Sequence, residues 1–186
     1  LLNAKLDKWL TQFMSKKTFK YIKNKYFDSK NTTLNATVIK SNLKGGQLSV
    51  YDAVFKEAAL KYNWDWLLLA SVAYQESKFN PNVRGFGGAY GMMQFMPNTG
   101  PKYGVYPSSP PNVQILGAMK KMSKDFNSWN QIPDKAQREK FTLATYNAGR
   151  GHIEDAQRLA RKHGLNPFIW DDNVEEMMAN LSKSEY

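Results

Sequence analysis

The feature that most constrains the fold is the run WLLLASVAY at residues 66–74, which is apolar on nearly every side of a helix. A helix that is apolar all round has to be buried, so this run predicts a helix at the centre of a core. Asp65 can cap its start, and the helix is expected to end near Ser77, because Asn80 precedes a proline and avoids the helical region. We expect the rest of the domain to be built around this helix.

Apolar residues recur at helical spacing along most of the chain beyond residue 48. Further helices are predicted at about 50–62, 112–127, 134–147, 152–163 and 171–182, with Asn112, Asp134 and Asp171 as N-caps and Gly149 and Gly164 as stop signals. Ser49 and Asp52 resemble a capping box for the first of them. Residues 82–91 predict a glycine-rich turn region with a short hairpin. The predicted fold class is mainly α, with a small irregular or β element in the middle.

The first 48 residues differ from the rest of the chain. Residues 1–28 predict two short amphipathic helices, and residues 29–48, polar with a Gly-Gly pair, predict a linker. Residues 1–48 hold ten Lys against two acidic residues, so most of the formal net charge of +10 lies there. A solvated helix face and contact with an anionic surface, either phospholipid or acidic wall polymer, both fit these lysines. No basic–aromatic motif accompanies them, so no nucleic-acid partner is expected.

Several absences from the sequence limit the chemistry. There is no cysteine, no Gly-x-Ser-x-Gly elbow and no phosphate loop. His152 and His163 lie in charged surroundings without a second ligand at metal spacing, so neither a metal nor a cofactor is expected. The chain starts at Leu1 without a signal segment, and no run approaches the roughly 20 apolar residues that span a bilayer. Any export signal or lipid anchor is expected upstream.

Glu76 is the acidic residue of the central helix. Its neighbours one turn back, Val72 and Ala73, are apolar and desolvate it, and the last turn of a helix presents the negative end of the dipole. Both effects raise the pKa of a carboxyl group, as a general acid near neutral pH requires. The alternative from the residue alone is a surface ion pair with Lys78 or Arg84, which is the commoner role of a lone helical Glu.

Three sequence blocks surround this residue in order: AYQESKFNP at 73–81, GAYGMMQFMP at 88–97 and ATYNAG at 144–149. Together they resemble the Glu-Ser, Gly-x-Met-Gln and Tyr-Asn-Ala-Gly motifs of lytic transglycosylases of the soluble-lytic-transglycosylase type, relatives of goose-type lysozyme. The resemblance covers about 49–165 and implies a lysozyme-like catalytic domain at 49–186. The segments at 51–52 and 64–66 look closest to membrane-bound members that carry a solute-binding-like domain upstream, whose tail residues 1–48 would then be.

The resemblance implies cleavage of the β-1,4 bond between N-acetylmuramic acid and N-acetylglucosamine in peptidoglycan. Glu76 would protonate the bridging oxygen and then take the proton of the muramoyl C6 hydroxyl, which attacks C1 and gives a 1,6-anhydro product. A periplasmic enzyme is implied, held at the outer membrane by an upstream anchor and regulated by the upstream domain. A lysozyme-like hydrolase needs a second carboxylate, and none lies within the three blocks. A hydrolytic muramidase and a peptidoglycan-binding module without turnover remain as alternatives.

The resemblance also assigns roles to other residues of the blocks. Tyr146 is expected to orient or polarise Glu76 through its hydroxyl, with core packing as the alternative. Gln94 offers its amide to the 2-acetamido group, and Met93 is expected to touch the substrate. Gly85 departs from the family pattern, which often carries Ser at this place to help hold the acetamido group.

Three more residues complete the expected substrate-binding set. Ser77 either forms a hydrogen bond near the site or caps the helix end. Tyr90, like Phe86 and Tyr103, has a ring that can stack on a sugar face. Asn147 is expected to hold the turn after Tyr146 more than to contact sugar.

Overall fold

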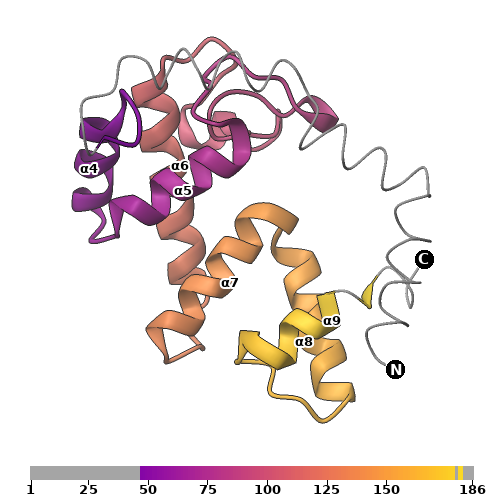
Figure 1. Ribbon diagram of the computed structural model, residues 1–186. Coiled ribbons are helices and arrows are strands. Elements are labelled where there is room, and N and C mark those ends of the chain that lie inside the picture. Colours follow the sequence, from indigo (N-terminus) through magenta and orange to yellow (C-terminus); the bar gives the residue numbers. More distant parts are fainter. Residues whose placement is uncertain (1–46, 179, 182–186) are drawn as a thin grey trace, which may run out of the picture.

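A computed structural model describes residues 47–178 and 180–181 (Figure 1). Within them lie the helices α4 (Asp52–Lys61), α5 (Trp66–Ser77), α6 (Pro111–Ser128), α7 (Lys135–Ala148), α8 (Arg150–Lys162) and α9 (Glu175–Met178). Short helical turns of other types are η1 (Phe86–Gly88), η2 (Gly100–Tyr103) and η3 (Trp170–Val174). The mainly α fold class is confirmed. The helices predicted in residues 1–28, and all but the end of the predicted linker, lie outside the described residues.

The central helix α5 has the predicted bounds and the predicted cap. The Asp65 carboxylate accepts the backbone N–H of Leu67 at 2.8 Å, and Leu69 with its neighbours on one side is buried. The prediction of burial on every side is wrong, because Leu67 and Tyr74 are 47% and 49% exposed. Among the described residues, α4 and the loop after α5 cover only part of its circumference.

The bounds of α4, α6, α7 and α8 lie within two residues of the predicted ones. Asp134 caps α7 by accepting the N–H of Gln137 at 2.7 Å. The capping box predicted for α4 forms only in part: the Asp52 carboxylate accepts the N–H of Ser49 at 2.8 Å, but the Ser49 hydroxyl accepts the N–H of Tyr51 and not that of Asp52. The predicted cap Asn112 is wrong. Helix α6 begins one residue earlier at Pro111, because the fixed φ of proline suits the first helical turn.

Two other local predictions are corrected. In place of a hairpin at 82–91, the described chain forms the turn η1 and isolated bridges of Tyr90 with Arg84 and Phe95. Asp171 does not cap a helix from 171 to 182, because its carboxylate pairs with Lys140 and accepts a hydrogen bond from Gln137 at 3.3 Å. The chain around Asp171 forms the irregular turn η3, and the helix that follows, α9, is short.

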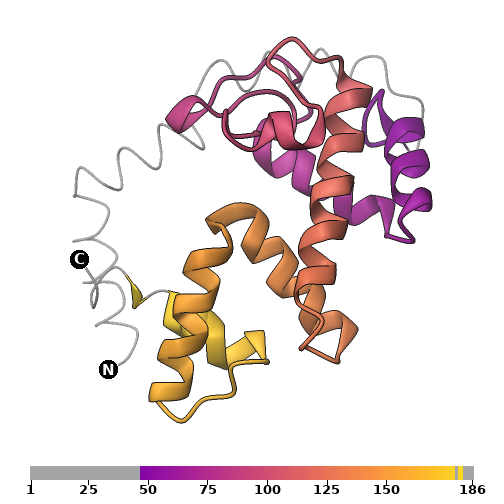
Figure 2. The same cartoon turned by 180° about the vertical axis from the view of Figure 1, so that it is seen from behind.

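The described residues pack around two apolar clusters. The first joins α4, α5, α6 and the loop between α5 and α6, and the second joins Trp129, Phe141, α8 and α9. Figures 1 and 2 both show α4, α5 and the loop at one end of the molecule, α8 and α9 at the other, and α7 between them. In the part of the chain that the structure covers, no helix is long and apolar enough to cross a membrane.

Candidate active site

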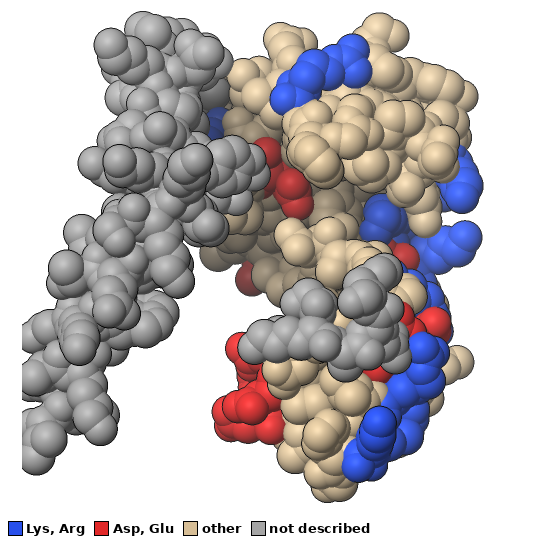
Figure 3. Space-filling model, turned by 90° about the vertical axis from the view of Figure 1, so that its right-hand side faces the viewer, with Lys and Arg blue, Asp and Glu red and all other residues tan. Residues whose placement is uncertain are grey.

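A cleft of about 580 Å³ lies where the two clusters meet. Its walls come from the α5–α6 loop, the second half of α6, the end of α7 and the start of α8. The lining side chains include Gln94, Met96, Lys102, Tyr103, Lys121, Lys124, Asp125, Thr145, Tyr146, Asn147 and Arg150. Figure 3 shows the described surface hollowed between its two halves, with acidic atoms exposed inside the hollow.

Glu76 lies in the last turn of α5 and is half-buried. Burial raises the pKa of its carboxyl group. Within residues 47–178 and 180–181 the carboxyl group forms no hydrogen bond and no ion pair. The two suggested ion-pair partners lie elsewhere: the Lys78 ammonium lies 4.1 Å from the ring centroid of Tyr74, and the Arg84 guanidinium is over the Tyr90 ring. The surface ion pair is therefore not formed, and the carboxyl group is available to a ligand.

The chain turns sharply directly after this residue. Lys78 and Phe79 have φ angles of 56° and 64°, in the left-handed region that residues other than glycine seldom adopt. Phe79 is buried and its ring lies 5.9 Å from that of Phe55, so core packing holds the turn. The turn ends α5 at Ser77 and keeps Glu76 in its final turn.

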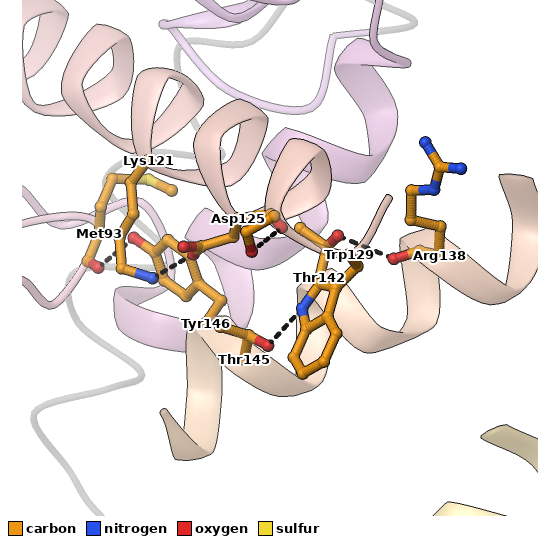
Figure 4. A network of polar contacts seen from close by, with 9 residues as sticks. Met93, Lys121, Asp125, Trp129, Arg138, Thr142, Thr145 and Tyr146 are labelled. Atoms are coloured by element: carbon orange, nitrogen blue, oxygen red, sulfur yellow. Dashed lines mark hydrogen bonds and ion pairs between the residues drawn. The ribbon is translucent and has the colours of Figure 1, made fainter. Parts of the chain in front are cut away.

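Tyr146 lies near the C-terminal end of α7, and Figures 1 and 2 both place this end next to the C-terminal end of α5. Its hydroxyl donates a hydrogen bond to the Met93 carbonyl oxygen at 2.8 Å (Figure 4). Burial raises the pKa of Tyr146 well above its usual value, and the negative charges of Glu76 and Asp125 add to this effect. The phenol therefore lies within electrostatic range of both carboxylates.

The loop that carries the second motif is fastened to α6 by one buried side chain, Gln114. Its Oε1 accepts the N–H of Met92 at 2.5 Å, and its Nε2 donates to the carbonyls of Ser109 at 2.7 Å and Pro81 at 3.2 Å. Gly91 has a φ of 78°, and a Cβ there would lie 2.4 Å from Gln114 Oε1, so this position requires glycine. The glycine of the motif thus lets α6 approach the loop.

The predicted substrate-binding residues divide into those that reach the cleft and those that do not. Gln94 and Asn147 line it. Met93 and Tyr90 are 0% and 2% exposed, and the Tyr90 hydroxyl donates to the Val105 carbonyl at 2.8 Å, so neither side chain is presented to a ligand.

Ser77 also turns away from a ligand, because its Oγ donates to the Ala73 carbonyl of its own helix at 3.2 Å. The methionine that reaches the cleft is Met96, which is 44% exposed. Of the other two aromatic candidates, Tyr103 lines the cleft and Phe86 is 96% exposed at the loop tip.

The sequence reasoning missed a carboxylate that lines the cleft, Asp125 on α6. It forms an ion pair with Lys121 at 2.6 Å, and the two side chains are only 17% and 15% exposed. The Lys121 ammonium also lies 4.5 Å from the centroid of the Tyr146 ring. The one signal in the sequence is the four-residue spacing of the two charges, which is too common on helix surfaces to indicate a site.

The transglycosylase SLT domain family matches residues 53–169 of the chain. The chain therefore belongs to this family, as its motifs predicted, and the predicted lysozyme-like helical fold is confirmed.

Among individual proteins, the chain is similar to membrane-bound lytic murein transglycosylase F of Pseudomonas fluorescens strain Pf0-1, with 32% identity over 188 residues that cover all of this chain and 38% of the relative. The protein of the same name from Pseudomonas fluorescens strain Pf-5 is 36% identical over 140 residues, covering 75% of this chain and 29% of the relative. The protein of this name from Shewanella loihica is 40% identical over 122 residues, which cover 66% of this chain and 25% of the relative. The chain thus spans well under half the length of these relatives.

Proposed function

We propose that this chain is the catalytic domain of a peptidoglycan lytic transglycosylase. The observation that carries the proposal is the state of Glu76: a half-buried carboxyl group whose pKa is raised and which has no partner among the described residues. A raised pKa favours the protonated form of the carboxyl group, from which a general acid donates its proton to a leaving oxygen. Family membership and the names of the relatives support the substrate, a murein glycan strand.

In the proposed reaction, protonated Glu76 donates its proton to the oxygen that bridges N-acetylmuramic acid and N-acetylglucosamine. The bond from muramoyl C1 to this oxygen breaks, and its electron pair stays on the oxygen, which leaves as a hydroxyl group. The C6 hydroxyl of the same muramoyl residue attacks C1, and the Glu76 carboxylate takes the C6 proton and is protonated again. The product is a 1,6-anhydromuramoyl end, and no water is consumed.

Residues that line the cleft have supporting roles in this proposal. Tyr146 orients Glu76 electrostatically while its hydroxyl is anchored to the loop. Gln94 and Asn147 contact the sugars, since both line the cleft. Met96 supplies the apolar contact that the sequence assigned to Met93.

Asp125 favours a second candidate function, a hydrolytic muramidase, because such an enzyme needs a second carboxylate to act on water or on C1. The ion pair with Lys121 at 2.6 Å argues against this role, since it holds the carboxylate in a charge-assisted hydrogen bond. We therefore place transglycosylation first.

The setting of the domain is also a proposal. The relatives are named membrane-bound and are much longer than the chain. We infer that an upstream regulatory domain, of which residues 1–48 are the end, accompanies this domain. We also infer that the protein is periplasmic and is held at the outer membrane by an anchor outside this sequence.

The test is digestion of purified peptidoglycan followed by mass spectrometry of the soluble products. Wild type is compared with Glu76→Gln and with Glu57→Gln, a matched change at an exposed site on α4. We expect muropeptides lighter by one water than hydrolysis products from wild type and Glu57→Gln, and none from Glu76→Gln. Products with a reducing end would assign a muramidase, and turnover by Glu76→Gln would refute the role of Glu76.

A further inference from the structure

Gly85 is a glycine that its own backbone does not require. Its φ of −108° and ψ of −174° are extended angles that any residue adopts. A Cβ added there would nevertheless lie 2.0 Å from Gln94 Oε1 and 3.2 Å from Gln94 Cδ. The first distance is far below any non-bonded contact, whereas the next neighbour, the Ala89 Cβ at 3.3 Å, is merely tight. The Gln94 side chain therefore fills the space that a side chain at position 85 would take.

The carboxamide of Gln94 is held in this place by its donors. Nε2 donates to the Gly91 carbonyl at 2.8 Å and, at the longer distance of 3.4 Å, to the Val83 carbonyl. The backbone of Gln94 has a φ of 47°, in the left-handed region, so the residue is fixed in an uncommon conformation.

This arrangement decides what Gln94 can offer a ligand. A carboxamide has two donor hydrogens and one acceptor oxygen, and both hydrogens point to the loop carbonyls. In the described part of the chain, Oε1 accepts no hydrogen bond, although Gln94 is half-buried and lines the cleft. Because the loop carbonyls engage the donors, Oε1 is the hydrogen-bonding atom of this carboxamide that stays free, among the described residues, for a ligand of the cleft.

We propose that Gly85 is a positioning residue for Gln94: because it has no side chain, the carboxamide folds against the loop and presents Oε1 alone to the substrate. The sugar that occupies this part of the cleft then has to bring a hydrogen-bond donor, an amide N–H or a hydroxyl. This inference rests on the proposed function, since it takes the ligand of the cleft to be a glycan.

A double-mutant cycle with Gly85→Ala and Gln94→Ala tests the coupling. Gly85→Ala displaces the carboxamide and is expected to lower kcat/KM for peptidoglycan digestion about as much as Gln94→Ala does, roughly 5- to 10-fold, the loss of one hydrogen bond to the substrate. In the Gln94→Ala background the clash is gone, so Gly85→Ala is expected to have no further effect. The control Gly151→Ala places a methyl in open space at an exposed position and is expected to keep wild-type activity.

A merely structural role of Gly85 gives a different result, because Gly85→Ala would then lower the Tm and kcat equally in both backgrounds. That outcome overturns the proposal. So does a Gln94→Ala variant that keeps full activity, since the acceptor would then not touch substrate.

An NMR measurement keeps the positioning step separate from the proposed function. The side-chain amide signals of Gln94, assigned by their loss in Gln94→Ala, are expected to be dispersed and slow to exchange in wild type. In Gly85→Ala they are expected to move to the values of a solvated glutamine. Unchanged signals in Gly85→Ala overturn the proposal, even if wild type digests peptidoglycan. Changed signals in a protein that yields no glycan products would sustain the positioning and refute the proposed function.

Discussion

Replacing Gln114 with Leu tests whether α6 holds the loop that carries the second motif. The side chain is 2% exposed and forms three hydrogen bonds with the backbone of Met92, Pro81 and Ser109. Leu keeps most of the volume and removes all three bonds. At about 1 kcal/mol of net stability each, the loss is about 3 kcal/mol, or roughly 10 °C in Tm for a domain of this size.

The chain offers a matched control in Gln157 on α8. It is 4% exposed, and its Nε2 donates one hydrogen bond, to the Pro167 carbonyl at 2.7 Å. Gln157→Leu is therefore expected to lose about 1 kcal/mol, a third of the effect.

Urea and thermal unfolding followed by circular dichroism measure both losses, and digestion of peptidoglycan below both midpoints measures the effect on activity. Gln114→Leu is expected to lower activity because it frees the loop beside the cleft, whereas Gln157→Leu leaves it unchanged. Equal losses of stability in the two variants would refute the claim that the loss is proportional to the number of hydrogen bonds removed. Full activity of Gln114→Leu would refute the link between this side chain and the cleft.

Glu76→Gln is expected to raise the Tm at pH 7. Burial raises the pKa of Glu76 in the folded state, so the wild type loses stability as the pH rises above the pKa of this group in the unfolded chain. In a pH series of melting curves, the difference in Tm between the two proteins should disappear below about pH 4. The same variant is expected to give no detectable products in the digestion assay, a loss of well over about 100-fold in activity. Tyr146→Phe removes the bond to the Met93 carbonyl and is expected to lose about 1 kcal/mol in urea unfolding, with a fall in kcat larger than any rise in KM. Lys121→Met breaks the ion pair with Asp125, in which both side chains are less than a fifth exposed, and is expected to lower the free energy of unfolding by about 2 kcal/mol. Lys135→Met breaks the more exposed pair with Glu139 and is expected to lower it by less than about 0.5 kcal/mol in the same assay.

The parts of the fold that were predictable from the sequence are those set by near neighbours. The bounds of α5 and the caps Asp65 and Asp134 depend on atoms two or three residues away. The position of Glu76 in a last turn follows from the same local rules. The pattern around it identified the family, which composition could not have done.

The contacts that could not be predicted from the sequence join residues that lie far apart in the chain. The sequence predicts Asp171 as a local cap, but its partners Lys140 and Gln137 lie 31 and 34 residues away. The role of Gln114 is not predictable from the sequence, because its three partners lie 5, 22 and 33 residues away. The choice between Met93 and Met96 depends on the path of an irregular loop, for which no hydrophobic period exists.

Gly85, where the family often carries Ser, shows why the positions of a motif cannot be interpreted one at a time. Taken alone, a glycine there leaves a polar role vacant. In the structure the Gln94 oxygen lies 2.0 Å from where a Cβ at residue 85 would be, so the place is filled from a residue nine positions later. A side chain at 85 and the folded carboxamide of Gln94 exclude each other, so a change at either position alters what the other can do. Gly85 and Gln94 therefore determine together which hydrogen-bonding groups this loop offers. Substitution of either residue alone is expected to change the substrate preference.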